Sequence, residues 1–133
     1  LVARPQDPVA LAGLSRLQIA DPLQTESSLR NRLATQPDAP ENLALRLALA
    51  DTLGRQQRWA EAQQAWFDAH RLAPDDPDIA YNLAVSLDHL GQTPPAARYY
   101  RKALQLSERR PARFSSERAE TRLNALQATE PPP

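Results

Sequence analysis

The sequence predicts an all-α protein in which antiparallel helix pairs form a right-handed stack that ends in a C-terminal capping helix. Two observations carry this prediction. The chain matches itself at an offset of 34 residues, and a fixed period of this length is typical of stacked helical units. Within each unit the apolar residues recur every three to four positions, as one face of a helix does. The matched pairs are Leu49 with Leu83, Ala50 with Ala84, Leu53 with Leu87, Ala62 with Ala96, Trp66 with Tyr100, Ala69 with Ala103, and Leu72 with Leu106.

The two repeats account for four of the predicted helices. Two of these follow a capping residue joined to a proline, as in Asp76-Pro77 and Thr93-Pro94. Proline is tolerated at the first helical position because the N–H that it lacks has no partner within the helix. The 13 prolines of the chain therefore agree with a helical fold. The four helices are predicted over residues 42–56, 59–72, 77–90 and 94–107.

The flanking segments predict further helices. Residues 8–20 and 22–36 carry leucine stripes but fit the 34-residue frame poorly, so they are interpreted as a degenerate first pair. Residues 116–128 are charged and amphipathic, as the cap of a helical stack is, and three prolines end the chain. The predicted single domain thus divides into a first pair at 1–42, repeats at 43–76 and 77–110, and a capping segment at 111–133.

The repeated residues resemble the tetratricopeptide repeat family, whose units are helix–turn–helix pairs that stack into an α-solenoid. Gly91 stands where this family has a turn glycine, whereas Gln57 occupies that place in the first repeat. Trp59 and Trp66 coincide with signature positions of a second helix, which predicts that both belong to the core. The resemblance covers residues 43–110 and implies a fold more specifically than a function.

The sequence contains no constellation of residues that would support catalysis. Its two histidines, His70 and His89, fall in different predicted helices and outside the spacings that metal ligands use. There is no cysteine, so disulfides and thiolate metal sites are excluded. We therefore predict that the protein is not an enzyme and uses no metal and no cofactor.

The charge of the chain argues against nucleic acid as a partner. Its 16 basic and 16 acidic residues leave no net positive charge to attract phosphates. Glu108 lies within the basic run of positions 98–113, and Glu117 and Glu120 follow it, which favours a solvated helix face. Because the chain begins at Leu1 and holds no long apolar run, membrane contact is expected only through a segment absent from this chain. The basic run consists of Arg98, Arg101, Lys102, Arg109, Arg110 and Arg113.

The family resemblance implies a protein or peptide partner. In this family the first helices of the units line a concave groove that holds a peptide. Members that clamp a chaperone's terminal carboxylate need a lysine and an asparagine where Leu47 and Asp51 stand, so this role is excluded. The exposed apolar and acidic residues of the groove predict a ligand with apolar anchors and basic residues. The implied groove residues are Leu47, Asp51, Arg55, Asp78, Tyr81, Asn82, Val85, Asp88 and His89.

The second repeat, from Pro77 to Gln92, is also similar to repeat domains of membrane-anchored bacterial proteins in pilus biogenesis and secretion. This similarity implies a non-catalytic scaffold for assembling an envelope machine, on the periplasmic face of the membrane. Two alternatives stay open: a periplasmic scaffold that holds an apocytochrome, and a self-association module whose apolar surface is buried in a homodimer.

Overall fold

The computed structural model describes residues 22–35 and 42–129, and all of the regular structure in these ranges is helical. The predicted all-α fold is confirmed. None of the described helices is long and apolar enough to cross a membrane. The helix predicted over residues 8–20 and the three prolines at the C-terminus lie outside the described residues. The helices are α2 (Pro22–Thr35), α3 (Asn42–Arg55), α4 (Trp59–Leu72), α5 (Pro77–His89), α6 (Thr93–Ser107) and α7 (Ser116–Thr129).

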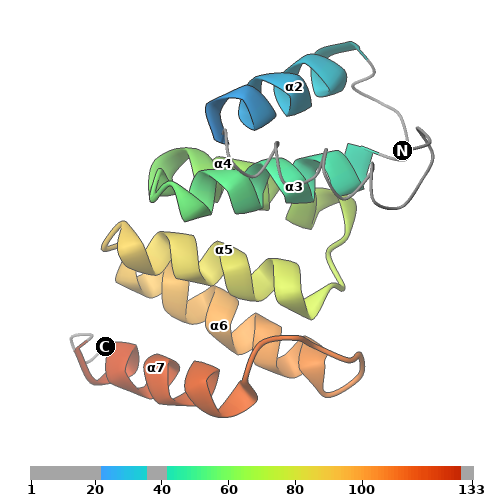
Figure 1. Cartoon of the computed structure of the whole chain (residues 1–133). Helices are drawn as coiled ribbons and strands as arrows, with labels where there is room; N and C mark the ends of the chain where they lie inside the picture. The colour runs from blue at the N-terminus through green and yellow to red at the C-terminus, as the bar shows by residue number, and fades with distance from the viewer. Residues whose placement is uncertain (1–21, 36–41, 130–133) are drawn as a thin grey trace, which may run out of the picture.

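The helices are stacked in chain order (Figure 1). The helix pairs α3–α4 and α5–α6 form the middle of the stack, and α4 joins the two pairs by packing against α5. At the ends, α2 packs against α3 and α7 packs against α6. The main contacts therefore connect helices that are neighbours in sequence, which is the arrangement of a solenoid stabilised by its adjacent units.

The matched turns of the two repeats share one backbone form. Gly91 has a φ of 75°, and Gln57 has a φ of 60°. This left-handed region is open to glycine and costs other residues about 1 kcal/mol. In both turns the N–H of the next residue donates to a leucine carbonyl five positions earlier, over 3.0 Å. The repeat is thus preserved in the backbone even where glycine is replaced.

The N-terminus of α5 is capped as the sequence predicts, whereas Thr93, predicted to cap the next helix, is instead the first residue of α6, and Gln92 before it makes no side-chain cap. The Asp76 carboxylate accepts hydrogen bonds from the backbone N–H groups of Asp78, over 2.9 Å, and Ile79, over 3.3 Å. Pro77 occupies the first position of the helix. Such a cap contributes about 1 kcal/mol, because it satisfies N–H groups that have no partner within the helix.

The core is built from small residues at helix contacts and large residues between them. Eight alanines have no exposed surface, so the helix backbones can approach closely there, and leucine and aromatic side chains fill the remaining space. Trp66 is 8% exposed, in agreement with its predicted core position, and its matched residue Tyr100 is 3% exposed. Trp59, also predicted to belong to the core, is only partly buried. The fully buried alanines are Ala50, Ala62, Ala69, Ala80, Ala84, Ala96, Ala97 and Ala103.

A network of charges ties α2 to the turn between α3 and α4. Arg30 donates to Glu26 over 2.8 Å and to Glu61 over 3.1 Å, and Arg58 pairs with both carboxylates. Glu26 is buried, and the hydrogen bond from Arg58 is the main reason that its pKa lies below its usual value. Leu29 adds an apolar contact to the core. α2, whose apolar stripe fits the repeat poorly, is therefore held by these polar contacts together with Leu29.

Candidate functional site

A groove runs along the face of the stack formed by α3 and α5. It consists of two hollows, of about 690 Å³ and about 200 Å³, whose linings share four residues. The shared residues come from α3, α4 and α5, so the hollows are neighbouring parts of one surface. The four are Asp51, Arg55, Trp66 and Asn82.

Most of the groove residues implied by the sequence line this surface. The larger hollow includes those of α3 and of the first half of α5, and the smaller hollow adds Val85. This grouping arises because α3 and α5 occupy equivalent places in successive repeats. The implied residues that line the larger hollow are Leu47, Asp51, Arg55, Asp78, Tyr81 and Asn82.

The other two implied residues, Asp88 and His89, lie outside both linings and make internal contacts. Asp88 accepts hydrogen bonds from Arg122 of α7, over 2.6 and 2.7 Å, and from the Tyr100 hydroxyl, over 3.0 Å. The Arg122 guanidinium is the main cause of the lowered pKa of Asp88. The His89 ring stacks on Trp59, with 3.9 Å between the ring centroids. These contacts attach α7 and order the end of α5.

The segment between α6 and α7 forms one end of the groove. The Asp78 carboxylate accepts hydrogen bonds from the backbone N–H groups of Arg113, over 2.8 Å, and Phe114, over 3.3 Å. The Phe114 ring stacks on Tyr81, with ring centroids 4.6 Å apart and planes within 2°. Tyr81 also meets the edge of Tyr100. Tyr81, expected as an exposed apolar contact, is therefore half-buried and belongs to the groove wall.

Sequence reasoning missed several residues of the lining. Arg113 and Phe114 lie in an irregular segment beyond the second repeat, where a repeat pattern makes no prediction. Trp66 was assigned to the core, and it is buried, yet it also lines both hollows. An aromatic residue in a polar segment, as Phe114 is, was the signal that could have indicated this contact.

The groove has apolar walls and a slightly acidic lining. The larger hollow is lined by three carboxylates and two guanidinium groups, which leaves one net negative charge. Asp51 pairs with Arg55 over 2.9 Å on the exposed face of α3. Asp76 and Asp78 accept hydrogen bonds from backbone N–H groups, which hold these carboxylates in place. This arrangement suits an apolar side chain accompanied by a cation.

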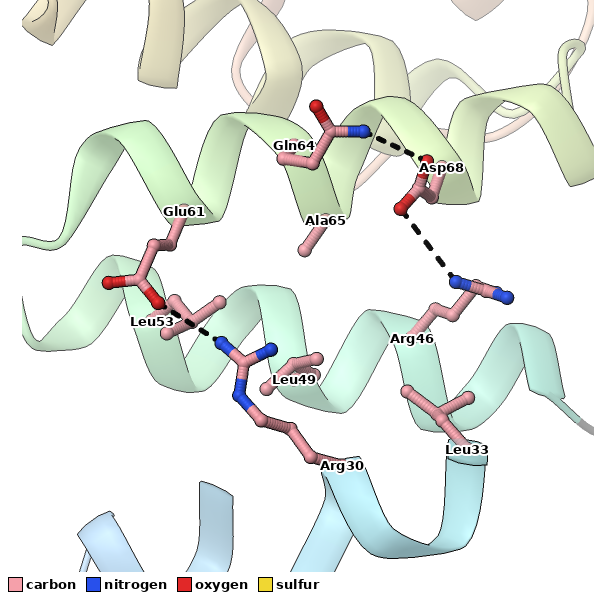
Figure 2. Close-up of a pocket in the computed structure, with 9 residues that line it drawn as sticks. All are labelled: Arg30, Leu33, Arg46, Leu49, Leu53, Glu61, Gln64, Ala65 and Asp68. Atoms are coloured by element: carbon pink, nitrogen blue, oxygen red, sulfur yellow. Dashed lines mark hydrogen bonds and ion pairs between the residues drawn. The ribbon is translucent and has the colours of Figure 1, made fainter. Parts of the chain in front are cut away.

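A further hollow, of about 320 Å³, lies where α2 meets α3 and α4 (Figure 2). Leu33, Leu49 and Leu53 contribute apolar surface to it. Arg30 pairs with Glu61 over 3.1 Å, and Arg46 lies 3.8 Å from Asp68, so an ion pair bridges the helices at each side. Because the charged groups already face one another, we interpret this hollow as a space at a helix junction and place the candidate site in the larger groove.

The described residues contain no group of three or more histidine, aspartate or glutamate side chains that could hold a metal ion. His70 is buried, and burial is the main cause of its lowered pKa, with the charge of Lys102 adding to the effect. Its imidazole is therefore a packing group that touches the edge of Tyr99. The arrangement presents surfaces for contact with another molecule, without a cluster of reactive groups in the described part of the chain.

The stack of helix pairs and its lined groove define a helical-repeat protein, a class whose general role is to bind other proteins. No protein-family model matches the chain. A tetratricopeptide repeat-containing protein of Pseudomonas aeruginosa is 40% identical to it over 86 residues, which are 64% of this chain. This similarity confirms the expected resemblance to the tetratricopeptide repeat family. The chain spans 14% of the length of that relative.

Proposed function

We propose that the protein is a non-catalytic scaffold that binds a peptide segment of a partner protein in the groove between α3 and α5. The observation that carries this proposal is the grouping of Leu47, Tyr81 and Val85 along two adjacent hollows of about 690 and 200 Å³. Partly exposed apolar side chains rimmed by charge are the usual character of a protein-binding surface.

The lining favours one class of ligand. Leu47, Tyr81 and Val85 offer apolar surface to a large side chain, whose burial supplies most of the affinity. Asp51 is exposed at the rim, and its ion pair with Arg55 is open to water and therefore weak. A lysine or arginine of the ligand can compete for this carboxylate. The proposed ligand is therefore an extended segment with one large apolar residue next to a basic residue.

Selection from a library of random twelve-residue peptides tests this proposal. Peptides selected on the whole chain should combine an apolar anchor with lysine or arginine. Leu47→Ala should weaken the binding of a selected peptide by about 1–2 kcal/mol, because it removes a partly buried contact. Leu72→Ala is the matched control, since Leu72 is 55% exposed and lines neither groove hollow. Equal binding to the parent and to Leu47→Ala would refute the groove as the site.

The alternative of a homodimer predicts a different result. If the same surface is buried between two copies, light scattering should show a dimer in the parent chain. Leu47→Ala or Asp51→Lys should then shift the mass toward the monomer. A monomer at all concentrations would exclude this alternative and leave the peptide groove.

The biological process in which the proposed scaffold takes part is a separate and more specific prediction. An assembly role in a bacterial pilus or secretion machine, at the periplasmic face of a membrane-anchored protein, follows from the similarity of the second repeat to such scaffolds. An apocytochrome-holding scaffold is the alternative in the same class. Peptides from pilus, secretion and apocytochrome components, measured against the groove variants, would separate these roles.

A further inference from the structure

The basic residues of the chain divide into two groups. Arginines in α2 to α4, and Arg122 in α7, form the ion pairs of the described structure. By contrast, none of the seven cations between positions 98 and 118 forms an ion pair within the described residues, and all seven are exposed. The seven are Arg98, Arg101, Lys102, Arg109, Arg110, Arg113 and Arg118.

Four of these cations form one stripe, which we call the basic face: Arg98, Arg101, Lys102 and Arg109. Along a helix of 3.6 residues per turn, positions 98, 101, 102 and 109 fall within about 100° of one another. The buried residues of α6, such as Ala96 and Tyr100, lie on the opposite side. The backbone N–H of residue 109 still bonds to a carbonyl of the last turn, over 3.1 Å, which continues the stripe past the end of α6.

Positive charge is concentrated in one segment of the chain, although the chain as a whole has no net charge. Residues 93–118 contain the seven cations and two carboxylates, whereas residues 42–92 contain four cations and seven carboxylates. The first segment is thus strongly positive and the second moderately negative. Because charges farther apart than about 8–10 Å are screened in physiological salt, the basic face acts on a partner that lies against it and attracts distant polyanions poorly.

We propose that the basic face is a second binding surface, separate from the groove, and that its ligand is an acidic segment of a protein. Guanidinium groups bind carboxylates through two parallel hydrogen bonds, and three of the four cations are arginine. The stripe extends eleven residue steps, from position 98 to position 109, or about 16 Å along the helix. This length matches about five residues of an extended chain. The ligand therefore carries about four carboxylates over that distance.

Other anionic partners fit the basic face less well. Single-stranded nucleic acids bind aromatic platforms beside their phosphate contacts, but the nearby Phe114 ring is stacked on Tyr81. Binding at a membrane interface uses apolar residues beside the cations. Leu72 is the exposed large hydrophobic residue of the described chain, and it belongs to α4. An acidic protein segment needs neither feature.

The test uses the whole chain and a fluorescent peptide whose central five residues are four glutamates and one serine. The double variant Arg98→Gln/Lys102→Gln should weaken peptide binding about tenfold at low salt, the loss expected for two charge pairs. Arg32→Gln/Arg71→Gln removes the same charge from exposed sites elsewhere and should change binding less than twofold. A peptide with glutamine in place of glutamate should not bind, and the groove variant Leu47→Ala should bind the acidic peptide normally.

Three results would overturn the proposal. The proposal would be wrong if the two double variants lost the same affinity for the acidic peptide, because net charge alone would then explain the binding. A duplex DNA oligonucleotide or phosphatidylglycerol vesicles would bind more tightly than the acidic peptide if the face served another polyanion. The acidic peptide would fail to bind at low salt if the cations were merely solvated.

Discussion

Replacing Asp78 by alanine should release the end of the groove, because one carboxylate connects α5 to the segment before α7. Asp78 accepts the N–H groups of Arg113, over 2.8 Å, and Phe114, over 3.3 Å. A hydrogen bond to a charged group contributes about 1.5–3 kcal/mol when buried. Asp78 is half-buried and the second bond is long, so we expect about 2 kcal/mol for the two bonds together.

A smaller effect adds to this loss. Asp78 lies in the first turn of α5, where a negative charge interacts with the helix dipole by about 0.3–1 kcal/mol. Asp78→Ala should therefore lower the free energy of unfolding by about 2–3 kcal/mol in urea denaturation. Asp78→Asn keeps an acceptor oxygen and should lose about 1 kcal/mol. Asp75→Ala, which removes a neighbouring exposed carboxylate, should change the stability by less than about 0.5 kcal/mol.

Amide hydrogen exchange measures the local effect directly. In Asp78→Ala the N–H groups of Arg113 and Phe114 should exchange much faster, while those in the middle of α4 keep their protection. Loss of this anchor should also free the Phe114 ring from Tyr81 and weaken the binding of groove peptides. The reasoning would be refuted if both amides kept their protection in the alanine variant, since they would then have another acceptor.

Three further predictions concern the rest of the stack. Gln57→Gly should raise the free energy of unfolding by about 0.5–1 kcal/mol, because glycine relieves the positive φ; an unchanged urea midpoint would contradict this. Glu26, whose pKa is lowered chiefly by Arg58, contributes stability above its unfolded pKa of about 4.5 that is lost as the pH falls through its folded pKa. The parent should therefore be more stable than Glu26→Gln at pH 7, and the difference should shrink towards pH 3; a difference independent of pH would argue against the charge network. Trp66→Ala should cost about 3–5 kcal/mol by leaving a cavity beneath the groove, and a midpoint equal to that of the parent would place Trp66 outside the core.

The two repeats could be predicted from the sequence because the residues that specify each helix lie close together in the chain. A helical stripe such as Leu83, Leu87 and a cap such as Asp76-Pro77 depend on residues within one or two turns. The predicted helices of residues 59–72 and 94–107 accordingly match α4 and α6 to within one residue. The equivalence of Gln57 with Gly91 was also visible from the period, although its positive φ required the structure.

Contacts between distant residues were decided by the tertiary structure. Asp78 and Phe114 are 36 positions apart, and Asp88 and Arg122 are 34 apart. Such pairs leave no periodic signal, since each residue taken alone resembles an ordinary surface side chain. Asp88 was thus expected in the groove and instead attaches α7.

The sequence by itself therefore determined the class of fold, the helix order and the face on which α3 and α5 present their side chains. Helix periodicity and close-packed alanines are sufficient for this, because neighbouring units interact through the same positions each time. The tertiary structure decided which of those side chains remain free to contact a partner. A carboxylate that caps a loop and one that faces solvent, such as Asp78 and Asp51, differ only in what the fold brings beside them.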